Sequence, residues 1–475
     1  GRTVLISGCI DTQKVHISSA IASGYKYMLI VTSDEAKARK MCDDASFFNR
    51  EAIYYPAKDA IFYSADVHGN QITGERLRCI SRIINHSSTG EGVLTVVTTM
   101  DGIADRLIPV ERFKEAVITL DYSSEIEPEK LAKKLVAMGF VRTGMVEDKG
   151  QFAIRGGIID IFSYTDEAPV RIELWDTEVD SIRMFDVESQ RSIERLQSYS
   201  IFPATEYIFT EDELKNGLYN IKEECDRQLE CFDYGKRKRT KEQIEAGNNL
   251  NKLVADVERT GNYEKFTDTL VADTVGLAEY FPEENTLVVL DEPNRLKECN
   301  ELTLYEYNES MKNRLAAGYV LPSQTNKVKA MNEIIGDLRN NKKLILTTLD
   351  YKPEGFEIDY SMYITARSIS SYNNSFEYLA KDLEKYKKNG YTTILVCSSR
   401  TRALRIVDDL GKLGIASFYS EDFNKDYGSG LIIVTYGSLH KGFEYPVLSF
   451  VVIAENDIFS ARKMKKLKKK KHDGK

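Results

Sequence analysis

Short apolar runs alternate with helical segments from the start of the chain. Residues 3–8 form a strand-like run that ends at a glycine, and a helical pattern follows to about Ser23. Residues 27–32 form a second such run, followed by a predicted helix over residues 33–47. Buried strands that alternate with helices are typical of a parallel sheet with helices on its faces. The pattern therefore predicts an α/β lobe at the beginning of the chain.

The middle of the chain changes to strand-like patterning. A helix is predicted over residues 128–138, with Gly139 as its stop signal. The strands predicted after it are residues 151–154, 157–162 and 170–175. Asp176 and Thr177 then form a predicted turn, so this part is predicted to be a small β-meander.

The rest of the chain returns to α/β patterning. The helices predicted there are residues 211–229, 236–259, 376–388 and 401–413. The strands predicted there are residues 288–290, 344–348, 392–396, 431–435 and 449–453. The whole pattern predicts a multidomain α/β fold with a parallel sheet, an inserted β-rich α+β domain and a separate small α/β domain.

The same pattern divides the chain into segments. They are residues 1–120, the first part of the first lobe; 121–203, the inserted domain; 204–367, the return to the first lobe; 368–374, a polar linker; 375–457, the small α/β domain; and 458–475, a basic linker. A chain of this length is expected to hold several domains, each with its own core.

Composition narrows the class of protein. The chain has 475 residues, of which 42% are hydrophobic and 29% charged, as in ordinary globular proteins. No apolar run is long enough to span a bilayer, so we expect no membrane contact. The seven cysteines are scattered singly, which argues against a disulfide scaffold or a zinc site and favours the reducing cytoplasm. The net charge of −8 argues against a protein that coats DNA.

Four side chains of the predicted meander are candidates for a binding surface. They are Arg155, Arg171, Trp175 and Arg183. Arginine and tryptophan are residue types enriched at binding hot spots. The alternative is that Trp175 lies in the core and that the arginines are solvated or form local salt bridges. The pattern alone leaves both interpretations open.

The turn after the first predicted strand has part of the pattern of a phosphate-binding loop. An active loop needs Gly, four residues, Gly-Lys and then Ser or Thr, because backbone N–H groups wrap the phosphates and the hydroxyl binds Mg²⁺. Gly8 and Lys14 fit, but Gln13 stands at the second glycine and Val15 at the hydroxyl position. We interpret the segment as a degenerate nucleotide site, and the alternative is a coincidental helix start. Neither interpretation favours ATPase activity, and no metal site is predicted.

Asp291 and Glu292 follow an apolar run over residues 286–290, as in a Walker B motif. In an active motor such an aspartate supports Mg²⁺ and the glutamate activates water. Strand ends commonly carry acidic residues as well. The pair is therefore either a Walker B-like remnant or purely structural.

The segment from Gly150 to Ser192 carries a longer motif. The matching residues are Gly150, Phe152, Arg155-Gly156, Ile159-Asp160-Ile161-Phe162, Arg171-Ile172-Glu173, Asp176, Glu178, Ser181-Ile182-Arg183 and Gln190-Arg191-Ser192. On these residues the segment resembles the second domain shared by the nucleotide-excision-repair protein UvrB and the Mfd family of transcription-repair coupling factors.

Residues 56–78 resemble the first domain of both families and distinguish between them. UvrB has a long aromatic-rich hairpin here that threads damaged DNA. This chain has only a short loop, with Tyr63 near its tip, before a helix predicted from about Gly74. Together with the degenerate phosphate loop, this makes the chain similar to the amino-terminal UvrB-like region of the Mfd family.

The resemblance implies a UvrB-like module with a degenerate RecA-like sheet and a non-catalytic role in transcription-coupled DNA repair. The inserted domain would bind UvrA by mimicking UvrB, with Arg155, Arg171 and Trp175 as contacts and Arg183 as additional surface. Trp175 replaces the phenylalanine usual in the family.

The resemblance also implies that this chain is part of a longer bacterial, cytoplasmic protein that has further activities. That protein would carry an ATP- and Mg²⁺-dependent, helicase-like DNA translocase, so no cofactor is expected for this chain. Its further partners would be RNA polymerase, double-stranded DNA and a carboxy-terminal domain that masks the UvrA-binding face.

Two other functions stay open. A UvrB-type ATP-dependent DNA helicase would require nucleotide at Lys14. A DNA-binding protein would act through the basic tail at residues 462–471. The basic cluster at residues 236–239 could contact phosphate only at low salt, and solvated charge that contacts no nucleic acid is the favoured interpretation of both segments.

Overall fold

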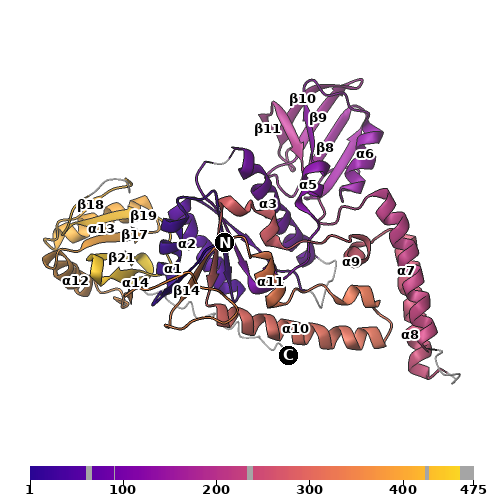
Figure 1. Ribbon diagram of the computed structural model, residues 1–475. Helices are drawn as coiled ribbons and strands as arrows, with labels where there is room; N and C mark the ends of the chain where they lie inside the picture. Colours follow the sequence, from indigo (N-terminus) through magenta and orange to yellow (C-terminus); the bar gives the residue numbers. More distant parts are fainter. Residues whose placement is uncertain (60–66, 90, 233–238, 423–426, 460–475) are drawn as a thin grey trace, which may run out of the picture.

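The structure is a computed structural model that describes residues 1–59, 67–89, 91–232, 239–422 and 427–459. Figure 1 shows a central sheet with its helices, a β-rich domain above it and a small α/β domain to its left. The predicted α/β multidomain class is therefore confirmed.

A seven-stranded sheet forms the centre of the molecule. Its strands are β1 (Thr3–Ser7), β2 (Tyr27–Thr32), β3 (Glu51–Tyr55), β4 (Leu94–Thr99), β13 (Thr286–Asp291), β14 (Lys342–Thr347) and β15 (Tyr360–Tyr363). They lie in the order β15-β1-β14-β13-β2-β4-β3, and every neighbouring pair is parallel. Strands β2, β4 and β13 are buried along their whole length, as expected of parallel strands covered on both faces.

The late strands β13 and β14 lie in the middle of this sheet, between β1 and β2. Leu5 of β1 pairs with Ile345 of β14, and Leu29 of β2 pairs with Val288 of β13. The chain thus returns to the first lobe after the inserted domain. The lobe cannot close until both parts of the chain are present.

Helices cover the sheet on both faces (Figure 1). They are α1 (Asp11–Ala22), α2 (Glu35–Asn49), α3 (Val67–Thr89), α4 (Met100–Ile103), α5 (Val110–Ala116), α10 (Pro293–Ala316) and α11 (Met331–Asp337). The prediction that α3 begins near Gly74 was wrong, because the helix begins at Val67. A glycine inside a helix costs only about 1 kcal/mol, and a Cβ at Gly74 would lie 2.6 Å from the Tyr164 ring. Tyr63, expected near the tip of the preceding loop, lies outside the described residues.

A helical hairpin projects from the lobe at the right of Figure 1. The helices of this region are α7 (Glu211–Phe232), α8 (Lys241–Thr260) and α9 (Thr267–Leu270). The predicted start of α8 at residue 236 was wrong, because Thr240 caps the helix by accepting a hydrogen bond from the Gln243 N–H. Arg239 lies before this cap, and residues 236–238 of the basic segment lie outside the described residues.

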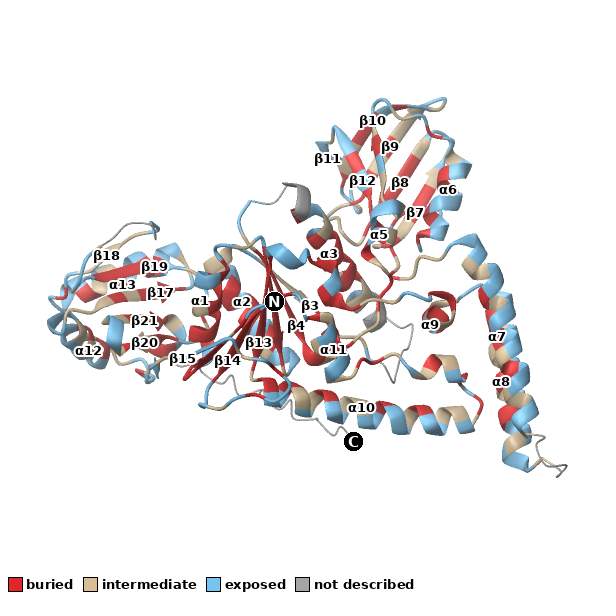
Figure 2. Cartoon of the chain, in the orientation of Figure 1, coloured by how far each residue is buried: buried red, intermediate tan, exposed pale blue. Residues whose placement is uncertain are grey.

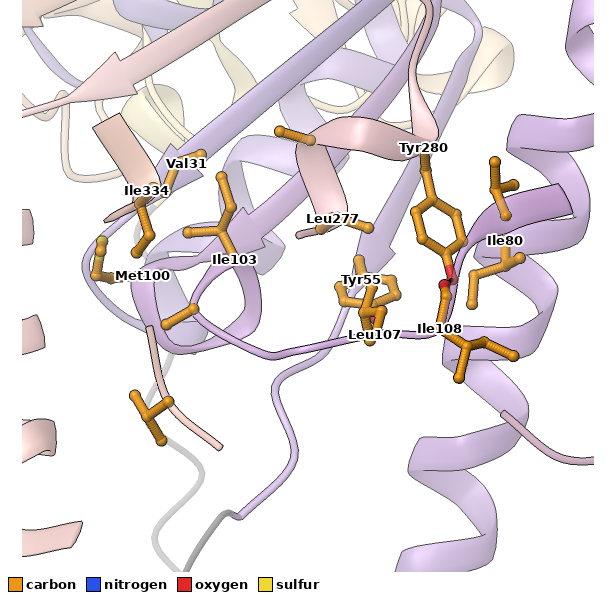
Figure 3. Close-up of a cluster of buried hydrophobic side chains, with 14 of the residues drawn as sticks. Val31, Tyr55, Ile80, Met100, Ile103, Leu107, Ile108, Leu277, Tyr280 and Ile334 are labelled. Atoms are coloured by element: carbon orange, nitrogen blue, oxygen red, sulfur yellow. Dashed lines mark hydrogen bonds between the residues drawn. The ribbon is translucent and has the colours of Figure 1, made fainter. Parts of the chain in front are cut away.

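A large hydrophobic core lies between the sheet and its helices. Figure 3 shows Val31 of β2, Ile103 of α4 and Ile334 of α11 within one cluster. In the same cluster the Tyr280 hydroxyl donates a 2.6 Å hydrogen bond to the Ile108 carbonyl. Figure 2 shows that buried residues concentrate on the central strands and on the inward sides of the helices. This core holds the carboxyl ends of the strands in place.

The inserted domain is a sheet with one helix on its inner face. Its elements are β5 (Ile118–Asp121), α6 (Pro128–Ala137), β6 (Val141–Arg142), β7 (Gln151–Arg155), β8 (Ile158–Phe162), β9 (Val170–Trp175), β10 (Glu178–Phe185), β11 (Ser192–Arg195) and β12 (Ser198–Ile201). The main sheet has the order β11-β10-β9-β8-β7-β6, and β5 pairs with β12 where the chain enters and leaves. Helix α6 buries Leu131 and Leu135 against the sheet. The helix and strands predicted here are confirmed.

The third domain is a second, smaller α/β sheet. Its elements are β16 (Arg367–Ser368), α12 (Phe376–Lys388), β17 (Thr392–Cys397), α13 (Arg400–Lys412), β18 (Phe418–Tyr419), β19 (Ile432–Tyr436), β20 (Phe443–Tyr445), β21 (Phe450–Ala454) and α14 (Glu455–Ile458). The strand order is β16-β20-β21-β17-β19-β18, with β17, β18, β19 and β21 parallel. This agrees with the strands and helices predicted for this part of the chain.

The third domain packs on α1 and α2 of the first lobe (Figure 1). Asp44 of α2 accepts a 2.8 Å hydrogen bond from the backbone N–H of His440. Gly437 lies so close to Phe47 that an added Cβ would be 2.1 Å from its ring. The helix that follows Gly8, α1, contacts the third domain as well, because Gln13 donates a 3.0 Å hydrogen bond to the Tyr445 hydroxyl.

Two further observations concern the chain as a whole. Within the described ranges, no helix combines the length and apolar character that a membrane crossing requires. The basic segment at residues 462–471, a candidate for nucleic-acid contact, lies outside those ranges.

Candidate functional site

The six-stranded sheet of the inserted domain has an apolar inner face and an outer face that carries a row of charged residues. Side chains alternate between the faces of a strand. Ile159 and Ile161 of β8 and Ile172 of β9 belong to the core on the inner face. Asp160 and Arg171 therefore lie on the outer face.

Strand register aligns charged residues in one row across this outer face. Asp160 is opposite Arg171, Arg171 is opposite Arg183, and Arg183 is opposite Arg195. We call this surface the arginine face; it consists of Arg155, Asp160, Arg171, Glu173, Trp175, Arg183 and Arg195. The sheet stands clear of the other domains in Figure 1, so a partner can approach it.

Asp160 holds two of these arginines. Its Oδ2 accepts hydrogen bonds from Arg155 Nη2 at 2.6 Å and from Arg171 Nη2 at 2.9 Å. Its Oδ1 accepts one from Arg171 Nε at 2.7 Å. Asp160 is 1% exposed, whereas the Arg155 side chain is 42% exposed. One buried carboxylate thus anchors one largely covered guanidinium, that of Arg171, and one accessible guanidinium, that of Arg155.

Arg171 has further contacts that restrain it. Its Nη2 also donates to Gln190 Oε1 at 2.8 Å, and its guanidinium lies 4.3 Å from the Phe185 ring centroid. The hydrogen bond to Asp160 raises the pKa of Arg171 above its ordinary value, although burial opposes this. Arg171 is therefore a fixed cation with little free surface.

The other end of the row is organised differently. Glu173 Oε1 accepts a 2.5 Å hydrogen bond from Arg183 Nη2, and Glu173 Oε2 accepts a 2.7 Å bond from the Ser181 hydroxyl. The exposed side chain of Arg195 has no hydrogen bond or ion pair within the described part of the chain. Arg195 and Arg155 are thus the more accessible cations of the arginine face.

Trp175 lies at the end of β9, beside the predicted turn. The turn forms, with Asp176 in the left-handed region at φ +59. The indole is 80% exposed, so the interpretation of Trp175 as a core residue is wrong. A large exposed ring next to several arginines is typical of an interaction surface.

The structure places Arg155, Arg171, Trp175 and Arg183 on one face, as a shared surface requires. Their role in binding stays a prediction. Sequence reasoning missed Asp160, Glu173 and Arg195 as members of this face. The alternation of Asp160 with buried isoleucines could have indicated the first of these, whereas Arg195 depends on the pairing of β10 with β11.

The predicted degenerate phosphate loop lies between β1 and α1. Gly8 has a φ of +81, and Gln13, Lys14 and Val15 are buried in α1. Lys14 Nζ donates to Asp291 Oδ1 at 2.8 Å and to Glu292 Oε1 at 2.6 Å. Burial would lower the pKa of Lys14, but the carboxylate of Asp291 raises it above its ordinary value.

The carboxylate of Asp291 is fully engaged. Its Oδ2 accepts a 2.6 Å hydrogen bond from the Thr32 hydroxyl and forms an ion pair with Lys37. Burial would raise the pKa of Asp291, but the charges of Lys14 and Lys37 hold it below its ordinary value. Gln13 also forms a hydrogen bond: its Nε2 donates to the Tyr445 hydroxyl of the third domain at 3.0 Å.

These contacts limit the chemistry of the loop. The lysine that would meet phosphate is neutralised by two carboxylates, and the carboxylate that would support Mg²⁺ is neutralised by two lysines. Among the described residues, no group of three or more His, Cys, Asp or Glu side chains is arranged to hold a metal ion. The arginine face is therefore the stronger candidate for a functional site.

Comparisons with known proteins point to the same domain. Residues 118–207 match the family model of the UvrB interaction domain. Over 480 residues the chain is 30% identical to a transcription-repair-coupling factor of Bacillus subtilis, covering 98% of the chain and 39% of that protein. Over 476 residues it is 27% identical to a transcription-repair-coupling factor of Staphylococcus haemolyticus, covering 99% of the chain and 39% of that protein.

The chain resembles the amino-terminal region of the transcription-repair-coupling factors along almost its whole length. The segment that matches the model of the UvrB interaction domain, residues 118–207, includes every residue of the arginine face. The chain spans 39% of the length of these curated relatives.

Proposed function

We propose that this chain is a non-catalytic recruitment module of transcription-coupled nucleotide excision repair that binds UvrA by mimicking UvrB. The observation that carries the proposal is the UvrB interaction domain at residues 118–207, whose outer sheet face gathers arginines and an exposed tryptophan. The name of the relatives, transcription-repair-coupling factor, supports the link to transcription.

The chemistry of the arginine face supports this role. Planar guanidinium groups bind carboxylates through two hydrogen bonds, and an exposed indole adds apolar area at small entropic cost. Arg155 and Arg195 offer accessible charge, and Trp175 offers the ring. A partner segment with Asp or Glu beside an apolar side chain would complement this surface.

The geometry around Lys14 supports a module without its own motor. A UvrB-type helicase needs the phosphate-loop lysine on the nucleotide, but here Lys14 lies between Asp291 and Glu292. The first lobe would then serve as a degenerate RecA-like scaffold that carries the docking domain. We expect neither ATP nor Mg²⁺ to bind it.

The remaining length of such a protein would supply the other activities. We propose that the longer protein has an ATP-dependent DNA translocase and contacts RNA polymerase and double-stranded DNA. A carboxy-terminal domain would mask the arginine face until repair begins.

The test is direct binding of purified UvrA to this chain, beside the variant Arg155→Ala plus Arg171→Ala. We expect wild type to bind and the variant to lose about 2 kcal/mol or more, as for paired hot-spot arginines. Arg295→Ala plus Arg405→Ala removes two exposed arginines outside the inserted domain and should bind as wild type does.

Circular dichroism establishes that each variant is folded. Absence of UvrA binding by wild type would refute the recruitment role. Retention of labelled ATP by wild type in equilibrium dialysis, together with its hydrolysis, would favour the helicase alternative instead.

A further inference from the structure

We propose that Asp160 is the positioning residue of the arginine face, holding Arg155 and Arg171 in the geometry that receives the carboxylate groups of the partner. This inference rests on the proposed function and deepens it. It assigns a role to a buried residue that does not itself touch the partner.

The position of Asp160 is set by the core. Its neighbours Ile159 and Ile161 are 0% exposed on the inner face, and Asp160 itself is 1% exposed. The strand cannot shift without removing both isoleucines from the core. The carboxylate is therefore a fixed point beneath the arginine face.

Both carboxylate oxygens are used to orient arginines. Oδ1 accepts from Arg171 Nε, and Oδ2 accepts from the Nη2 atoms of both Arg155 and Arg171. Two contacts to one guanidinium fix its plane as well as its distance. Gln190 and Phe185 restrain the same guanidinium from other directions.

The two arginines that Asp160 holds have different roles. One carboxylate and two guanidinium groups leave one net positive charge at the surface. The Arg171 side chain is 11% exposed and the Arg155 side chain is 42% exposed. Arg171 thus acts mainly as a bridge between Asp160 and Gln190, and Arg155 presents its remaining N–H donors to the partner.

Positioning of this kind strengthens binding. A free arginine side chain loses rotamer freedom when it docks, so one that is already held in place loses less. A site supported by buried hydrogen bonds also keeps its geometry when the partner is absent. Loss of the Asp160 charge should therefore weaken binding even though every contact residue remains.

The experiment compares UvrA binding of Asp160→Asn in two backgrounds. In the wild-type background we expect about 10-fold weaker binding, in the range of coupled neighbours. With Arg155→Ala plus Arg171→Ala already present, we expect less than about 2-fold further loss, because the residues that Asp160 positions are gone. Asp408→Asn, which removes an exposed carboxylate of the third domain, should bind as wild type does.

Two outcomes overturn the proposal. One is that Asp160→Asn binds UvrA as tightly as wild type. The other is an equal loss in both backgrounds, because a merely structural role would weaken binding whether or not the two arginines are present.

A second measurement uses the wild-type chain alone, without UvrA and without any variant. With ¹⁵N-labelled arginine in the wild-type chain, we expect the Arg171 Nε–H to exchange with water much more slowly than that of Arg405, which is 82% exposed. Equal exchange would overturn the positioning of Arg171 by Asp160. Slow exchange without any UvrA binding would instead support the positioning and refute the proposed function.

Discussion

The ammonium nitrogen of Lys14 lies 2.8 Å from Oδ1 of Asp291, and the two side chains are 4% and 0% exposed. The residues are 277 positions apart in the chain. The parallel sheet brings them together, because the strand that ends at Asp291 lies close to the turn before Lys14. The lysine that would contact phosphate in a motor is thus already paired with carboxylates of the same chain.

Removal of Lys14 should destabilise the first lobe. Lys14→Ala leaves the buried Asp291 and the partly buried Glu292 with less compensation, and breaking a buried pair in this way costs about 3–5 kcal/mol. Urea unfolding followed by circular dichroism measures the change. Lys412→Ala is the control, since it removes an exposed ion-paired lysine and should leave the urea midpoint close to that of wild type. Equal midpoints for Lys14→Ala and wild type would contradict the structural role of the pair.

The same pair predicts how stability depends on pH. Asp291 has a lowered pKa in the folded chain, held there by Lys14 and Lys37 against the effect of burial. Such a carboxylate contributes stability above its unfolded pKa of about 3.9 and loses it as pH falls through the folded value. Urea midpoints between about pH 7 and about pH 2 should therefore fall less steeply in Asp291→Asn than in wild type. An identical slope in both proteins would argue against this assignment.

Trp175→Ala should weaken UvrA binding without loss of stability. The ring is 80% exposed, so its removal leaves no cavity in the core. An aromatic anchor at an interface contributes about 2 kcal/mol or more, which is about 30-fold in affinity. Val447→Ala, at a residue of the third domain that is 83% exposed, is the control. Unchanged affinity of the Trp175 variant would exclude the indole from the interface.

Arg195→Ala tests whether the partner covers the whole row. Arg195 lies opposite Arg183 and is exposed, so it can meet a carboxylate at the edge of the interface. Charges at the rim act mainly on association and are screened by salt. We expect slower association by stopped-flow fluorescence at low ionic strength and a smaller difference at about 0.5 M salt. Association at the wild-type rate under both conditions would place Arg195 outside the interface.

Gly437→Ala should loosen the third domain from the first lobe. A Cβ at this position would lie 2.1 Å from the Phe47 ring, so one of the two surfaces must move. Limited proteolysis within residues 368–374 should become faster, and an N-terminal sequence of the product locates the cut. Gly411→Ala in α13 meets nothing within 4 Å and should be cut as slowly as wild type. Equal rates for all three proteins would show that the contact does not hold the domains together.

The spacing of hydrophobic and polar residues along the sequence predicted much of the fold. Short strand-like runs over residues 151–154 and 157–162, separated by glycines, and alternation over residues 170–175 were enough to predict β7, β8 and β9. The starts of α3 and α8 were wrong for different reasons. The sequence predicts a helix boundary near Gly74, but this glycine lies inside α3 because Tyr164 packs where a side chain would be. The capping bond between Thr240 and Gln243 places the start of α8 after the basic segment.

The sequence by itself determined many of the strands and helices, among them β7, β8 and β9, and that the phosphate loop lacks its glycine and hydroxyl at Gln13 and Val15. Only the tertiary structure decided that Trp175 is exposed, that Asp160 anchors two arginines and that Lys14 is enclosed by carboxylates. Whether a side chain is buried depends on which element packs against its face of the strand or helix. The ion pairs of Asp160 and Lys14 also depend on which strands are neighbours, and the whole core sets that arrangement. A local pattern does not identify such partners: Lys14 and Asp291 are 277 positions apart, and even Asp160 and Arg171 meet only because β8 and β9 pair in one register.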